Sequence, residues 1–406
     1  MIGFKYIILS LGLFLPAFSL PVLEETRQDG ETIPNQYIIT LKKNLVATEV
    51  ESHLSWVSDV HSRSLSRRDT VGLERTFSIG DFNAYAGEFD DETIAQISKN
   101  KNVAAFEPNK IALVTTLVSQ TNAPWGIASL SNPSLPSGNI MGQTYVYDEK
   151  AGADTWAYVL DTGIFIENTE FEGRAVKGYN AWPEDTFDDR FGHGSHVAGI
   201  IGSKTYGVVK KANVVDVKVV RGGYSTVAHV LDGLDWAVKN ITNTPGRASK
   251  SVVNLSLAFP TSDALNAGIE AAYAAGVLSV VGAANDGKDA STKSPASAPS
   301  AITVGAVAWN KTRASWSNYG LLVDIFAPGV DIPSLWNGQG IESVNSGTSM
   351  ASPHVAGLVL YLKALENLAT PAATTVRVKE LALKGVVASP GTGSPNLLTY
   401  NGIGAG

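Results

Sequence analysis

The chain of 406 residues contains no cysteine. Disulfide bonds, thiolate zinc sites, iron–sulfur clusters and cysteine nucleophiles are therefore excluded. The sequence also lacks a basic block, because 31 Lys and Arg stand against 38 Asp and Glu and give a formal net charge of −7. A protein that binds nucleic acid through its phosphates needs clustered positive charge. We therefore expect no nucleic acid among its partners.

An apolar run of membrane-spanning length is also missing. Residues 6–18 form an apolar run, but it is shorter than the ~20 residues that cross a bilayer. Lys5 precedes this run, and the small residues Ala17 and Ser19 end it, which is typical of a secretory signal peptide. A buried N-terminal helix is the alternative. We predict a signal peptide at residues 1–19 and a secreted, extracellular protein without membrane attachment.

Three Asn-x-Ser/Thr sequons fit a secretory route, and they begin at Asn240, Asn254 and Asn310. Asn254 lies inside the apolar run 252–257, which indicates a buried strand that a glycosyltransferase would not reach. The sequence therefore predicts glycosylation at Asn240 and Asn310.

Residues 20–117 carry most of the net negative charge and show the pattern of a small α+β unit. Runs that are apolar or alternate between apolar and polar residues predict strands, and longer runs with helical spacing predict helices. The expected strands are 37–41, 82–89 and 103–111, and the expected helices are 48–65 and 91–99.

Residues 118–406 are richer in Gly and Ala, and continuous apolar runs alternate there with helical stretches. This pattern is typical of a mostly parallel sheet with helices on both faces. We therefore predict a single α/β domain preceded by the small α+β unit. The expected strands are 156–160, 214–220, 252–257, 277–283, 301–307 and 322–326. One expected helix contains Gly199, and the others span 228–238, 264–275 and 352–368.

Three short motifs follow strands or begin helices, and functional groups gather at the carboxyl ends of parallel strands. In the first motif, Asp161 ends an apolar strand and Gly163 permits a sharp turn. A carboxylate at this place can orient a histidine and stabilise its charged form. Alternatively, Asp161 caps a turn, or it is one of the paired carboxylates of an aspartic protease.

The second motif places His193 between Gly192 and Gly194 at the start of a helix. The glycines leave room for another backbone or a ligand. His196 follows three residues later, so a two-histidine metal site is an alternative, although the glutamate of the zinc-protease helix is missing.

The third motif, residues 346–357, is the most specific. It predicts Ser349 at the start of a helix with Pro353 in the first turn. Free backbone N–H groups and the helix dipole favour negative charge there. An oxyanion that forms beside a serine nucleophile would be stabilised at this place.

In this order, the three motifs resemble those of subtilisin-like serine proteases. Further segments are similar to the proteinase K branch, and within it to the cysteine-free fungal alkaline proteases of the oryzin type. The resemblance covers essentially residues 119–401, and the upstream segment resembles the inhibitor-type propeptide of the family. The segments that carry the finer match are 120–126, 171–174, 294–299 and 394–401.

The resemblance implies a secreted serine endopeptidase of broad specificity, made as a self-processed zymogen, that cleaves after large apolar or aromatic residues. Ser349 would attack the scissile carbonyl, His193 would take and return its proton, and Asp161 would hold the imidazole. Asn285 would donate its side-chain amide to the oxyanion, beside the backbone N–H of Ser349. The tail of the propeptide, near residues 113–118, would lie in the groove before self-cleavage.

By the same resemblance, substrate would bind as an added extended strand between two segments. The chain departs from the usual glycines at Ala258, Phe259 and Ala284, and the added side chains are expected to narrow the primary pocket or bend the groove. The residues expected to line the groove are Gly222, Gly223, Tyr224, Ser256, Leu257 and Ala258.

The carbonyl groups of Pro299 and Ala301, together with the carboxylate of Asp324, would form a calcium site that serves stability. No cofactor is expected for the chemistry. The expected partners are protein and peptide substrates and the chain's own propeptide, which would act as an intramolecular inhibitor. The active form is expected to be a monomer.

Three other hypotheses stand beside this one. A catalytically inactive protein could keep the subtilisin fold and only bind. An aspartic-type protease that uses Asp161 would need a second such carboxylate, and the chain has a single Asp-Thr/Ser-Gly. A processing protease of the kexin kind is disfavoured, because no acidic cluster suggests a pocket for dibasic substrates.

Overall fold

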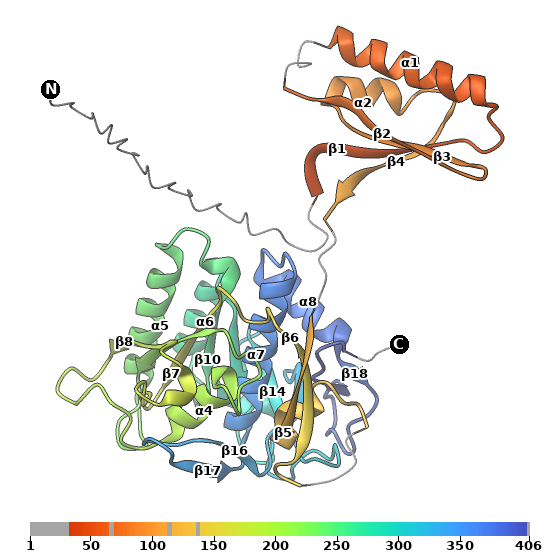
Figure 1. Cartoon of the computed structure of the whole chain (residues 1–406). Helices are drawn as coiled ribbons and strands as arrows, with labels where there is room; N and C mark the ends of the chain where they lie inside the picture. The colour runs from red at the N-terminus through yellow and green to blue at the C-terminus, as the bar shows by residue number, and fades with distance from the viewer. Residues whose placement is uncertain (1–31, 65–68, 112–115, 135–138, 404–406) are drawn as a thin grey trace, which may run out of the picture.

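The computed structural model describes residues 32–64, 69–111, 116–134 and 139–403. The predicted signal peptide, residues 1–19, lies outside them. Within the described residues, the N-terminal and C-terminal parts of the chain form separate sheets, and each sheet has its own helices (Figure 1).

The N-terminal unit contains a four-stranded antiparallel sheet with the order β2-β3-β1-β4. The sequence pattern missed β2. The other elements confirm the predicted α+β pattern with small shifts at their ends. The elements of this unit are β1 (Thr32–Leu41), α1 (Ala47–Arg63), β2 (Gly72–Ile79), β3 (Phe82–Glu88), α2 (Asp91–Ile97) and β4 (Val103–Lys110).

One face of this sheet is covered by the two helices. Ile39 and Tyr85 are cross-strand partners, and both are fully buried in a core that includes Val57 of α1 and Ile97 of α2. The opposite face is left uncovered, and Phe77 of β2 lies there with 38% of its surface exposed. The unit therefore presents an apolar sheet face.

The C-terminal domain contains a nine-stranded sheet with the order β18-β19-β15-β14-β12-β10-β7-β9-β8. Every neighbouring pair is parallel except β18 and β19, which confirms the mostly parallel α/β sheet. The strands are β7 (Trp156–Asp161), β8 (Ala175–Asn180), β9 (Asn213–Lys218), β10 (Ser251–Leu255), β12 (Ser279–Gly282), β14 (Ile302–Val307), β15 (Ile325–Pro328), β18 (Leu383–Lys384) and β19 (Leu397–Leu398).

The helices of this domain lie on both faces of the sheet, as β7 makes clear. Ala157 and Val159 belong to the core that contains α4 and α7, whereas Tyr158 and Leu160 belong to the core that contains α5 and α6. Alternate residues of a strand point to opposite faces, so the apolar run of β7 is buried on both faces of the sheet. The helices are α3 (Trp125–Ser129), α4 (His193–Gly202), α5 (Val227–Thr242), α6 (Asp263–Ala274), α7 (Thr348–Leu365) and α8 (Pro371–Leu381).

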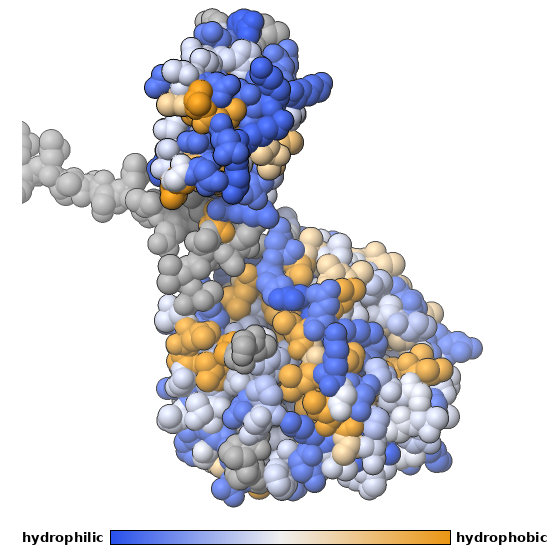
Figure 2. Space-filling model, turned by 90° about the vertical axis from the view of Figure 1, so that its right-hand side faces the viewer, coloured by the Kyte–Doolittle hydropathy of each residue, from blue (hydrophilic) through white to orange (hydrophobic). Residues whose placement is uncertain are grey.

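Three small two-stranded sheets complete the domain: β5 (Leu117–Ala123) with β6 (Gln143–Asp148), β11 (Phe259–Pro260) with β13 (Lys293–Ser294), and β16 (Ile332–Leu335) with β17 (Glu342–Asn345). Figure 2 shows a mainly hydrophilic N-terminal unit on the face it presents, and larger hydrophobic areas on the C-terminal domain. Among the helices of the described residues, none is both long and apolar enough to cross a membrane.

Candidate active site

Asp161 and His193 meet at the carboxyl end of the parallel sheet. Asp161 is the last residue of β7, and His193 is the first residue of α4. The imidazole Nδ1 lies 2.7 Å from Oδ1 of the buried Asp161. Burial opposes a charge on His193, but the attraction and hydrogen bond of Asp161, with a contribution from Asp189, prevail and raise the pKa of the imidazole. The pair can therefore stabilise an imidazolium.

The buried carboxylate of Asp189 joins the turn after Asp161 to the start of α4, and the sequence analysis missed it. Its Oδ1 accepts from the Thr162 hydroxyl at 2.9 Å and from the Gly192 N–H at 2.8 Å. Its Oδ2 accepts from the N–H and the hydroxyl of Ser195, at 2.9 and 2.7 Å. An Asp shortly before a helix start is a capping signal that sequence reasoning could have used.

Ser349 lies in the first turn of α7, as predicted. Its hydroxyl donates to the carbonyl oxygen of Ser256 at 3.1 Å. The prediction for Pro353 was wrong, because α7 begins at Thr348 and Pro353 lies in its second turn. A proline there leaves the carbonyl oxygen four residues earlier without its helical donor. The Ser256 hydroxyl supplies that donor, since it bonds the Ser349 carbonyl at 3.0 Å.

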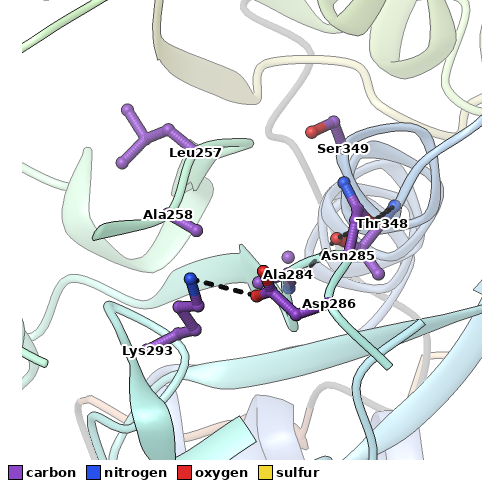
Figure 3. A pocket seen from close by; sticks show the side chains of 9 residues that line it. Leu257, Ala258, Ala284, Asn285, Asp286, Lys293, Thr348 and Ser349 are labelled. Carbon is purple, nitrogen blue, oxygen red and sulfur yellow. Dashed lines mark hydrogen bonds and ion pairs between the residues drawn. The ribbon is translucent and has the colours of Figure 1, made fainter. Parts of the chain in front are cut away.

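Asn285 lies beside the start of the same helix. Its Oδ1 accepts from the backbone N–H and the hydroxyl of Thr348, both at 2.9 Å. These two bonds fix which end of the amide is the oxygen and leave the nitrogen facing the cavity next to Ser349 (Figure 3). The preceding residue, Ala284, has a φ of 78°, a conformation that favours glycine.

Two hollows share the segment Leu257–Ala258 as a common wall. The first has a volume of about 240 Å³, and Ser349 and Asn285 line it. The second has a volume of about 380 Å³ and contains Asp161 and His193.

The predicted groove residues lie largely on the second hollow. Gly223, Tyr224 and Ser256 line it, whereas Gly222 lies next to it without lining either hollow. Ala258 and Ala284 both line the first hollow, and Ala258 and Phe259 line the second, so the three departures from the usual glycines lie on the walls that were expected to be narrowed or bent.

The residues proposed for calcium do not fit that ion. Oδ1 of Asp324 lies 2.6 Å from the ammonium of Lys379, and Oδ2 accepts from the Thr303 N–H at 2.8 Å. Both carboxylate oxygens are therefore engaged, and one of them is already paired with the positive charge of a lysine. Among the described residues, no group of three His, Cys, Asp or Glu side chains could hold a metal ion.

The two predicted glycosylation sites differ in their surroundings. Asn240 is half-buried on α5, and its Oδ1 accepts from the Tyr158 hydroxyl at 2.6 Å. Asn310 is exposed in a turn, where its Oδ1 accepts from the Thr312 N–H at 3.1 Å. Asn254 is fully buried in β10.

Comparisons with known proteins agree with this geometry. Residues 128–402 match the subtilase family, and residues 36–113 match peptidase inhibitor I9. The chain is 49% identical to "Subtilisin-like proteinase Mp1" of Magnaporthiopsis poae over the full length of both proteins. It is 47% identical to "Alkaline protease 1" of Aspergillus oryzae over 98% of each.

A solved structure described as a cold adapted subtilisin-like serine proteinase is also similar. It shares 38% identity and a TM-score of 0.64, and the match covers 69% of this chain and 99% of that one. The chain therefore belongs to the subtilase family, and it is a serine endopeptidase that carries an I9-type inhibitor propeptide and needs no cofactor for catalysis.

Proposed function

We propose that the mature protein is a secreted endopeptidase of broad specificity that acts through Asp161, His193 and Ser349. The observation that carries this proposal is the 2.7 Å contact between His193 and Asp161. It is supported by the common core of α4, which begins with His193, and α7, which holds Ser349 in its first turn, and by the wall Leu257–Ala258 that the two hollows share. His193 accepts the proton of the Ser349 hydroxyl while Oγ bonds the scissile carbon, and it then protonates the departing amine as the C–N bond breaks. Water hydrolyses the acyl-enzyme by the same proton transfers in reverse.

The resting hydrogen bond of the Ser349 hydroxyl to the Ser256 carbonyl gives substrate binding a role in this mechanism. A substrate strand that pairs along residues 256–258 donates its own N–H to that carbonyl. The hydroxyl is then displaced and turns toward His193. The developing oxyanion is bound by the Asn285 amide and the Ser349 N–H, since both belong to the first hollow.

Two further considerations oppose the alternative functions. An aspartic protease would need a second carboxylate against Asp161, whereas His193 occupies that position. An inactive binding protein would have no reason to keep Asn285 oriented by two hydrogen bonds. Labelling with a phosphonylating serine reagent tests the proposal: we expect reaction at Ser349 that is lost in His193→Ala. Sensitivity to pepstatin without labelling would overturn it.

We also propose that residues 1–19 direct secretion and that residues 20–117 are removed as a propeptide. The uncovered sheet face with Phe77, Ile79 and Phe82, each at least 38% exposed, offers an apolar surface for docking on the protease domain. A cut after residue 117 keeps the new N-terminus attached, because Val118 pairs with Tyr147 within β5 and β6.

Of the segment 113–118 that was expected in the groove, residues 113–115 lie outside the described residues. Leu117 and Val118 pair with β6 in this structure instead, so self-cleavage after residue 117 requires this end of β5 to open first. The proposal predicts that Ser349→Ala is secreted as an unprocessed chain. Secretion of that variant already trimmed near residue 117 would show that another protease does the processing.

For the residue before the scissile bond, we propose a preference for large side chains, since the 240 Å³ hollow lies directly beside Ser349. For the surface, we propose glycosylation at Asn310 in preference to the half-buried Asn240. Mass measurement before and after glycosidase treatment checks the second point, and the absence of any mass change would contradict it.

A further inference from the structure

Two charged side chains line the far end of the hollow beside Ser349. Its walls are the segment Leu257–Ala258 on one side and Ala284–Asn285 on the other. Figure 3 shows Ser349 at one end of this space and the side chains of Asp286 and Lys293 at the opposite end. A substrate side chain that enters beside the nucleophile therefore points its tip at two opposite charges.

The two charged groups form an ion pair. Nζ of Lys293 lies 3.0 Å from Oδ2 of Asp286, and the side chains are only 25% and 37% exposed. The ammonium and the carboxylate are partly desolvated already. An apolar substrate side chain that covers them would displace their remaining water without replacing its hydrogen bonds, which costs free energy.

The backbone holds both partners in place. Lys293 is the first residue of β13 and pairs with Pro260 of β11, directly after the wall segment of the hollow. The Asp286 N–H donates to Oδ1 of the buried Asn318 at 3.0 Å. The ion pair is therefore part of the built pocket and not a chance meeting of two mobile side chains.

We propose that Asp286 and Lys293 determine specificity, and that they select long, uncharged side chains with a hydrogen-bonding tip, such as Tyr and Gln, over Phe and Leu. This inference rests on the proposed function and refines its substrate class. The stem of such a side chain packs between Ala258 and Ala284, and its tip exchanges hydrogen bonds with the ion pair. A site built around polar groups rejects an analogue that leaves them unpaired.

The same geometry predicts how charged side chains behave. The closed pair has no net charge, so a Glu or Lys tip gains attraction from one partner and meets repulsion from the other. Removing one partner exposes the other. Lys293→Met leaves a carboxylate at the end of the pocket, and Asp286→Ser leaves an ammonium. The two variants should therefore change preference in opposite directions.

The experiment uses the secreted, processed enzyme and peptide substrates that differ only in the residue before the scissile bond. That residue is Tyr, Phe, Gln, Leu, Glu or Lys. The value of kcat/KM is expressed per active site titrated with a phosphonate, so that a variant that folds poorly is not mistaken for a selective one. Lys288→Met is the matched control, because Lys288 is an exposed lysine of the same loop that does not line the hollow.

In the parent enzyme we expect Tyr to exceed Phe and Gln to exceed Leu, each by roughly 10-fold, the value of a hydrogen bond to a charged group. Lys293→Met should raise cleavage after Lys relative to Glu by roughly 10- to 100-fold. Asp286→Ser should do the reverse, and Lys288→Met should change neither ratio.

Two failures can be told apart. Cleavage that does not depend on Ser349 would refute the proposed function. Cleavage that depends on Ser349, but with Phe equal to Tyr and with the same Lys-to-Glu ratio in both pocket variants, would refute the role of the ion pair alone.

Discussion

His354 lies five residues after Ser349 in α7 and is 1% exposed. Its Nδ1 donates to the carbonyl oxygen of Met350 at 2.8 Å, and burial lowers the pKa of the imidazole to about 4. His196 in α4 resembles it: its Nε2 lies 3.1 Å from the carbonyl oxygens of Ile332 and Ser343. Burial and the neighbouring His193 lower its pKa to about 4 as well. Both side chains are therefore neutral in the folded protein.

The lowered pKa values make stability depend on pH with a defined sign. Below pH 6.5 the unfolded chain binds two protons that the folded protein excludes, so stability is complete above that pH and falls as the pH decreases toward 4. A difference of about 2.5 pH units corresponds to ~3 kcal/mol for each histidine. Since free energies of unfolding are typically ~5–15 kcal/mol, the two together remove a large part of the total.

The assay uses the full chain with Ser349→Ala, so that self-digestion does not obscure unfolding. Urea denaturation followed by tryptophan fluorescence at several pH values between 7.5 and 4.5 gives the free energy of unfolding. We expect His354→Asn, which keeps a donor for the Met350 carbonyl, to reduce the slope below pH 6 by ~1.4 kcal/mol per pH unit. His229→Asn, at a half-buried position on α5, is the matched control. A slope in His354→Asn equal to that of the parent would refute the argument.

Three further changes test other features. Asp189→Asn removes a charge that raises the pKa of His193, so the acid limb of the pH profile of kcat/KM should move to lower pH; an unmoved limb would contradict this. Ala284→Gly removes the strain of an alanine at a φ of 78°, so the free energy of unfolding in urea should rise by up to ~1 kcal/mol. Cleavage after the largest side chains should also become faster. A lower free energy of unfolding would contradict backbone strain at Ala284. Lys379→Ala frees the Asp324 carboxylate, so the melting temperature of this variant should rise when calcium is added. If a chelator lowers the melting temperature of the parent protein, the lysine does not replace the ion.

The sequence predicted the central elements of the fold because they are buried on both faces. The run at 156–160 is continuous and apolar, which a two-sided core requires, and β7 begins there. Two of the missed strands, β2 and β8, lie at sheet edges, and each carries several polar residues. The helix α8 was missed because its β-branched Thr and Val residues have low helix propensity, although its cap by Thr370 and the following Pro371 are a start signal that the sequence contains.

The candidate site likewise contains residues that local sequence motifs predicted and contacts that they did not. Asp161, His193, Ser349 and Asn285 lie in local motifs, so the sequence alone suggested their roles. The Lys379 partner of Asp324 is 55 residues away along the chain, and no local pattern could have paired them. Long-range pairs depend on how helices and strands pack, which a single sequence does not specify.

The hydrogen bonds of Ser256 join the proposed nucleophile to the proposed substrate groove. Its carbonyl oxygen accepts from the Ser349 hydroxyl, and its own hydroxyl donates to the Ser349 carbonyl that Pro353 leaves without a helical donor. Asn254, fully buried in β10, donates to that hydroxyl at 2.9 Å and fixes its direction. The segment proposed to bind substrate is therefore bonded at two atoms to the residue proposed to attack it. Because a substrate strand competes for only one of these bonds, binding can release the hydroxyl for reaction while the second bond keeps the start of α7 in place.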